Sequence, residues 1–195
     1  MPNRVPLGLL LRIGVTLCVS LALTACASVQ PEGDVVPVSV STPPRDGKVV
    51  VGDPYRDFGA PELMGGTVRL SDLVGRKVVL LQFWGIRCAP CLAEMEFLTR
   101  LQVKHQDRGL QVVGVNTDRA TPAQLTEALV SRKIEPAFPH VLDPDFAISK
   151  HYTRWLIPVA VLIDRSGVVR AIHTGYKPEL EGTIEAEVEA LLGRQ

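Results

Sequence analysis

Two long apolar runs and a helical pattern between them dominate the middle of the chain. Residues 77–84 and 110–115 are almost continuously apolar, which is typical of strands buried on both faces of a sheet. Residues 90–107 place apolar side chains near helical spacing, and Gly109 ends that pattern. The sequence therefore predicts a buried strand, a long helix and a second buried strand in that order.

The flanking segments extend this alternation. Thr121 and Pro122 predict the start of another helix, because threonine caps helices and proline suits a first turn. The strand and helix patterns alternate along the chain, which then ends in a hairpin and a helix. This order predicts an α/β fold with a mixed central sheet flanked by helices. The other predicted elements are short strands at 55–60 and 67–70, a short helix at 146–152, a strand hairpin at 159–163 and 168–174, and a closing helix at 178–192.

The first 25 residues differ from the rest and have the pattern of a signal peptide. Their only charges are Arg4 and Arg12, and residues 13–23 form an apolar stretch too short to span a membrane comfortably. The stretch runs into Leu-Thr-Ala-Cys26, which resembles the lipobox of bacterial lipoproteins and implies that Cys26 becomes a lipid-carrying N-terminus. A plain secretory signal with a chance cysteine and an uncleaved anchor are the alternatives. All three predict export of the domain.

Residues 26–50 are rich in proline and glycine without an amphipathic period, so we expect a tether before a domain at 51–195.

The whole chain has 195 residues, 46% hydrophobic and 22% charged, which excludes a largely disordered chain and a polytopic membrane protein. Its formal net charge is +0, so nothing in the charge favours nucleic acid as a partner. Attachment to the membrane would then depend on lipid and not on basic residues.

The cysteine count points to one pair. Cys18 leaves with the signal and Cys26 is acylated, so Cys88 and Cys91 remain. They lie where the first buried strand ends and the long helix begins, which places Cys88 among unpaired N–H groups that favour a thiolate. Pro90 has no N–H to lose there. We expect an exposed attacking Cys88 and a buried resolving Cys91, as thiol–disulfide exchange requires.

Other uses of two neighbouring cysteines are weaker interpretations. A structural zinc site needs four ligands, no further cysteine is left, and the four histidines lack ligand spacing, so no metal is expected. A purely structural disulfide would close a very small loop. A Cu(I)-binding metallochaperone without turnover is the main rival, since soft thiolates select Cu(I). A peroxiredoxin needs a lone peroxidatic cysteine instead of a Cys-x-x-Cys pair.

The residues around the pair resemble a known family. Residues 83–91, Phe-Trp-Gly-Ile-Arg-Cys-Ala-Pro-Cys, look like the active-site stretch of the thioredoxin superfamily. Residues 92–95, Leu-Ala-Glu-Met, and 69–73, Arg-Leu-Ser-Asp-Leu, are similar to its exported TlpA/ResA-type branch. The resemblance covers roughly residues 50–192. It implies a thioredoxin fold with an N-terminal β-hairpin extension.

The same resemblance implies a function. Family members are thiol-disulfide oxidoreductases outside the cytoplasm, often protein-disulfide reductases, and some serve cytochrome c maturation or oxidase assembly. The expected partners are proteins with disulfides or thiols, together with a membrane electron donor or another thiol-disulfide partner. No cofactor is implied.

Further site residues follow from the resemblance. It implies a cis bond between Ile157 and Pro158 that faces the cysteines and leaves Ile157 free to pair with an extended substrate. Trp84 and Arg87 are expected to contact substrate as well. Arg87 replaces the usual tryptophan; it either favours the Cys88 thiolate or simply points to solvent.

Glu94 is the candidate proton acceptor. Gln82 occupies the position where cytoplasmic thioredoxins carry a buried aspartate, and an amide cannot take a proton. Glu94 lies three residues after Cys91 and therefore on the same helix face. We expect it to accept the Cys91 proton; the alternative is a solvated surface glutamate.

Overall fold

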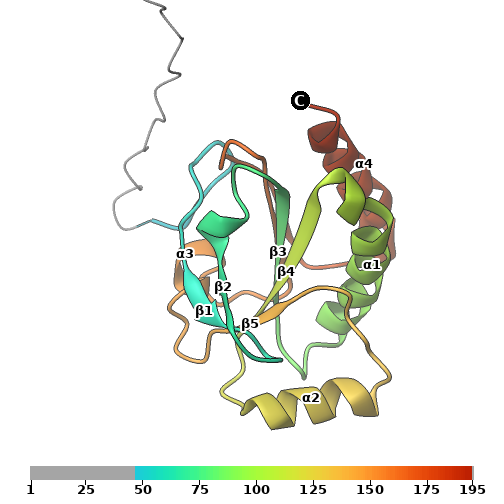
Figure 1. Ribbon diagram of the computed structural model, residues 1–195. Helices are drawn as coiled ribbons and strands as arrows, with labels where there is room; N and C mark the ends of the chain where they lie inside the picture. The colour runs from blue at the N-terminus through green and yellow to red at the C-terminus, as the bar shows by residue number, and fades with distance from the viewer. Residues whose placement is uncertain (1–46, 195) are drawn as a thin grey trace, which may run out of the picture. The chain divides into compact units, whose positions relative to one another are not determined.

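The computed structural model describes residues 47–194, which form a five-stranded mixed sheet in the order β5-β4-β3-β6-β7 (Figure 1). The central strand β3 pairs in parallel with β4 and antiparallel with β6, while β4 pairs in parallel with β5. The strands are β3 (Val78–Trp84), β4 (Leu110–Asn116), β5 (His140–Leu142), β6 (Val159–Ile163) and β7 (Val169–Thr174). This arrangement confirms the predicted thioredoxin-like α/β fold.

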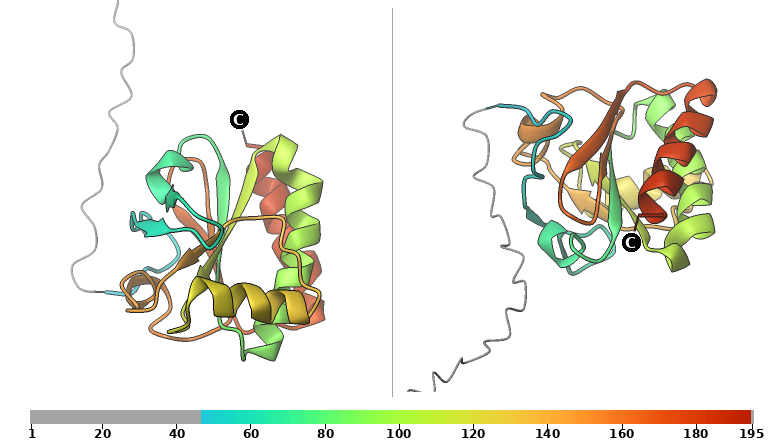
Figure 2. Two further views of the ribbon diagram at one scale, coloured as in Figure 1. Left: turned by 60° about the horizontal axis from the view of Figure 1, so that its bottom comes forward. Right: turned by 90° about the horizontal axis from the view of Figure 1, so that it is seen from above.

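Helices cover both faces of this sheet. They are α1 (Ala89–His105), α2 (Pro122–Ser131), α3 (Ser149–Tyr152) and α4 (Glu181–Leu192). Helices α1 and α4 lie side by side on one face, and α3 lies on the other (Figure 2). Alternate side chains of β3 enter different cores: Leu80 packs on the α1 and α4 side, and Leu81 on the α3 side. All seven residues of β3 are buried, which explains the continuous apolar run in the sequence.

The predicted N-terminal hairpin is present as a separate two-stranded sheet. Strands β1 (Gly59–Pro61) and β2 (Thr67–Arg69) pair antiparallel. After β1, Leu63 N–H donates to the carbonyl of His140 at 2.7 Å, and Glu62 forms a bridge with Val141. The hairpin segment therefore covers the outer edge of β5, which would otherwise expose unpaired backbone groups.

Helix boundaries follow local signals closely. The Thr121 hydroxyl accepts from the N–H of Gln124, whose side chain accepts from the Thr121 N–H, so α2 opens with a capping box. The closing helix begins one turn later than expected, because Pro178–Leu180 forms a 3-10 turn before α4.

The folded part starts before residue 51. Val49 is fully buried, and its N–H donates to the carbonyl of His151 at 2.9 Å. The predicted tether therefore ends earlier than residue 50. The predicted signal peptide and Cys26 lie outside the described residues. Within residues 47–194, no helix is long and apolar enough to cross a membrane.

Candidate active site

The two cysteines occupy the first turn of α1 and are joined by a disulfide. Cys88 is the N-cap residue, and its sulfur accepts from the Cys91 N–H at 3.3 Å. The side chain of Cys91 is fully buried, whereas Cys88 is partly exposed. The N–H of Cys91 and the positive end of the helix dipole both favour negative charge on the Cys88 sulfur once the disulfide is reduced.

Glu94 lies one turn further along α1 and is fully buried. The amide of Gln82 on β3 donates to Glu94 Oε2 at 3.0 Å and to the carbonyl of Cys91 at 2.9 Å. Burial raises the pKa of Glu94 to about 7, and the hydrogen bond from Gln82 opposes that rise. The alternative of a solvated surface glutamate is therefore wrong. The carboxyl group is held in the core by the same amide that bonds to the Cys91 carbonyl.

A short loop before Cys88 is fixed by residues that the sequence analysis missed. Asp118 accepts from the N–H of Ile86 at 2.7 Å and from the Asn116 side-chain amide at 2.9 Å. A Cβ on Gly85 would lie 3.1 Å from Ile157 Cδ1 and 3.3 Å from an Asp118 oxygen. Asn116 and Asp118 directly follow β4, and polar residues at that strand end were the available signal.

The bond between Ile157 and Pro158 is cis, as expected. Pro158 is buried, while Ile157 is exposed and its side chain lies against Gly85, three residues before Cys88. Trp155 and Leu156 are also exposed, at 64% and 52%. Trp155 is therefore not a core residue, and an apolar surface precedes the cis bond.

Trp84 and Arg87, both expected to contact substrate, have different surroundings. Trp84 is fully buried and packs edge-on against the ring of His140, with centroids 5.2 Å apart. A substrate cannot reach this indole in the described structure, so its predicted contact is corrected to a packing role. Arg87 is exposed next to Cys88, and its contact with substrate stays a prediction.

His140 is a second buried residue that the sequence did not single out. Burial lowers the pKa of its imidazole to about 3, so the ring is neutral at physiological pH. A Cβ on Gly114 would lie 2.1 Å from the His140 ring, so only glycine fits at that position of β4. Among the described residues, the cluster with metal-ligand geometry contains neither cysteine of the pair.

The sequence of this chain is similar to those of known thiol-disulfide oxidoreductases. Residues 51–172 match the model of the AhpC/TSA family. Thiol-disulfide oxidoreductase ResA from Geobacillus kaustophilus is 32% identical over 140 residues, which cover 71% of this chain and 78% of that protein.

Among solved structures, proteins described as thiol-disulfide exchange proteins are similar to this chain. A Chlorobium tepidum protein described as a thiol:disulfide interchange protein DsbE is 33% identical with a TM-score of 0.69, covering 75% of this chain and 100% of that one. A Bacteroides thetaiotaomicron protein described as a protein disulfide isomerase is 30% identical with a TM-score of 0.66, covering 74% and 91%.

Proposed function

Because this chain belongs to the AhpC/TSA family and is a thioredoxin-like thiol-disulfide oxidoreductase of the ResA/DsbE type, we propose that it reduces disulfides of exported proteins from a lipid anchor. The asymmetry of the pair carries this proposal: Cys88 is partly exposed at a helix N-terminus, and Cys91 is fully buried one turn inside. One sulfur is open to a partner, and the other can reach only Cys88.

The reaction begins with the reduced pair. The Cys88 thiolate attacks a partner disulfide; one partner sulfur leaves as a thiolate, and a mixed disulfide forms. Cys91 then loses its proton and attacks the Cys88 sulfur, which releases the second partner thiolate. The product is the Cys88–Cys91 disulfide present in the structure. A dithiol protein of the membrane would reduce this disulfide again by supplying two electrons. Proteins of cytochrome c maturation or oxidase assembly are the candidate substrates.

Glu94 is our candidate for the group that takes the Cys91 proton. With a pKa of about 7, a large share of Glu94 is ionised at neutral pH, which suits a general base. Gln82 connects the carboxyl group to the Cys91 carbonyl and holds it in place. We expect Glu94→Gln to slow resolution of the mixed disulfide by about 10²-fold, the lower end of general-base effects.

Stopped-flow exchange across pH 5–9 tests this role. Glu96→Gln is the matched control, because Glu96 lies on the same helix but is exposed. Superimposable pH profiles for the wild type and Glu94→Gln would show that Glu94 takes no part in the proton transfer.

Substrate would bind beside the cis bond. Ile157 is exposed and borders the loop before Cys88, so its backbone can pair with an extended segment of a partner. Trp155 and Leu156 add exposed apolar surface, and Arg87 adds a charge beside Cys88.

The reduction potential of the cysteine pair shows in which direction it transfers electrons. We expect a reduction potential for the Cys88–Cys91 pair near that of thioredoxin, about −270 mV, rather than near that of DsbA, about −120 mV. A value at the oxidising end would overturn the reductase assignment. Stable 1:1 Cu(I) binding without disulfide turnover would instead favour the metallochaperone.

Membrane attachment has its own test. The signal pattern that ends at Cys26 supports acylation there. Cys26→Ala should release the domain from the membrane fraction, because its small net charge gives little attraction to lipid headgroups. A variant that stays in the membrane fraction would favour an uncleaved anchor.

A further inference from the structure

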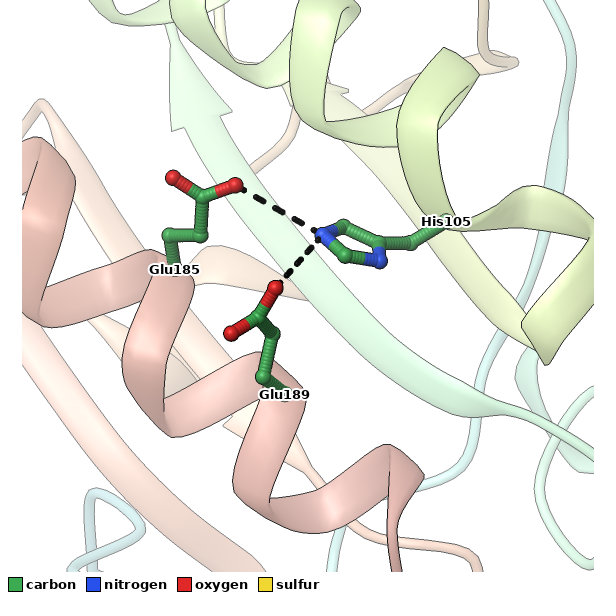
Figure 3. Close-up of side chains that lie close together, drawn as sticks. All are labelled: His105, Glu185 and Glu189. Atoms are coloured by element: carbon green, nitrogen blue, oxygen red, sulfur yellow. Dashed lines mark ion pairs between the residues drawn. The ribbon is translucent and has the colours of Figure 1, made fainter.

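A second group of ligand-type side chains lies at the far end of α1 from Cys88. His105, the last residue of α1, faces Glu185 and Glu189 on α4 (Figure 3). Nε2 of His105 is 3.6 Å from Oε1 of Glu185 and 3.7 Å from Oε1 of Glu189. The two glutamates are four residues apart, so they lie on the same face of the helix.

The imidazole is buried and its Nε2 is unsatisfied. His105 is 1% exposed, and among the described residues Nε2 has no hydrogen-bond partner. The distances to both carboxylates are too long for hydrogen bonds. A buried polar atom without a partner is costly, so this arrangement favours something placed between the three groups.

We propose that His105, Glu185 and Glu189 bind a Zn²⁺ ion, with water as the fourth ligand. Zinc bonds to nitrogen and oxygen of about 2.0–2.2 Å in a tetrahedron hold ligand atoms about 3.3–3.6 Å apart. The three ligand atoms all lie within 4.8 Å of one another, and the two measured separations from Nε2 are 3.6 and 3.7 Å. A small shortening of the distances between the three ligand atoms would bring them to the separations of a zinc tetrahedron.

Two cations border the cluster and must move. Lys104 Nζ lies 2.6 Å from Glu185 Oε1 and 3.6 Å from Glu189 Oε1, but its side chain is 56% exposed. Arg108 Nη1 is 3.2 Å from Nδ1 of His105; a guanidinium only donates, so Nδ1 accepts in this contact and the ring N–H is on Nε2. When zinc takes Nε2, that proton is relocated to Nδ1, and the exposed Arg108 turns into solvent.

Isothermal titration of the mature protein with ZnCl₂ tests the site. The protein is extracted in detergent to allow for the proposed lipid anchor, and it carries no affinity tag. It is kept oxidised, so that the bonded cysteines cannot bind the metal. We expect one Zn²⁺ per chain, with Glu185→Gln and Glu189→Gln each weakening binding at least about tenfold through loss of a ligand. Glu187→Gln, on the same helix but paired with His173 at 2.7 Å, is the control and should bind like the wild type.

Lys104→Gln separates a metal site from a simple ion-pair cluster. Removing the competing ammonium should tighten zinc binding about two- to fivefold, in line with the strength of an exposed ion pair. Zinc should also raise the melting temperature of the wild type and not that of Glu185→Gln. Absence of saturable 1:1 binding, or equal affinity in the wild type and both glutamate variants, would overturn the proposal.

Discussion

Burial of Glu94 should cost the protein stability at neutral and alkaline pH. In the folded chain its pKa is about 7, compared with 4.5 for an ordinary glutamate. Between these values the folded state binds more protons than the unfolded state, so stability falls as pH rises through the window from 4.5 to about 7. The difference of about 2.5 units, at about 1.36 kcal/mol each, gives a penalty of about 3 kcal/mol above pH 8.

Glu94→Gln keeps the size of the side chain and removes the titration. The Gln82 amide can still donate to the new amide oxygen, as it does to Glu94 Oε2. We therefore expect the variant to be more stable than the wild type by up to about 3 kcal/mol at pH 8, and nearly equal to it below pH 4.5. The free energy of unfolding, measured by urea titration of oxidised protein at several pH values, gives this difference directly.

Glu96→Gln again serves as the control, because Glu96 is exposed and its substitution should leave the pH dependence unchanged. The quantity to compare is the difference between variant and wild type, in which the titration of all other groups cancels. Parallel stability curves for Glu94→Gln and wild type from pH 4 to 8 would refute the assigned burial cost.

Three further predictions concern the surroundings of the pair. In reduced protein, brief alkylation should label Cys88 before Cys91, because Cys91 is fully buried; peptide mass mapping decides the order. Asp118→Ala leaves the Ile86 N–H without its acceptor and should lower the free energy of unfolding by about 1–3 kcal/mol in urea titration, whereas exposed Asp145→Ala should not. Trp155→Ala should change stability by less than about 0.5 kcal/mol, yet raise KM for a protein disulfide; an unchanged KM would exclude Trp155 from the binding surface.

The main elements could be predicted because burial and local capping determine them. Strand β3 is buried on both faces, so its sequence is continuously apolar, and the capping box at Thr121 marks the start of α2. The position of Glu94 was predictable from its spacing after Cys91, since residues three apart share a helix face. In these cases the sequence pattern and the tertiary environment agree.

Strand β5 was missed because its stability comes from neighbours and not from its own residues. It has three residues, and its pairing is supplied by β4 and by the hairpin segment at Glu62. The buried His140 depends on the missing side chain of Gly114, a fit between two strands that no local pattern reveals. The packing role of Trp84 also depends on this contact, since its ring lies against His140.

Cys88 and His105 lie at opposite ends of α1, too far apart for a charge at one to influence the other. The helix has 17 residues, so at 1.5 Å per residue its ends are about 25 Å apart. Screening in physiological salt acts over about 8 Å, so a charge at His105 has little direct effect on Cys88. A metal ion there would strengthen the contact between α1 and α4, while Cys88 would keep its own surroundings at the N-terminus of α1.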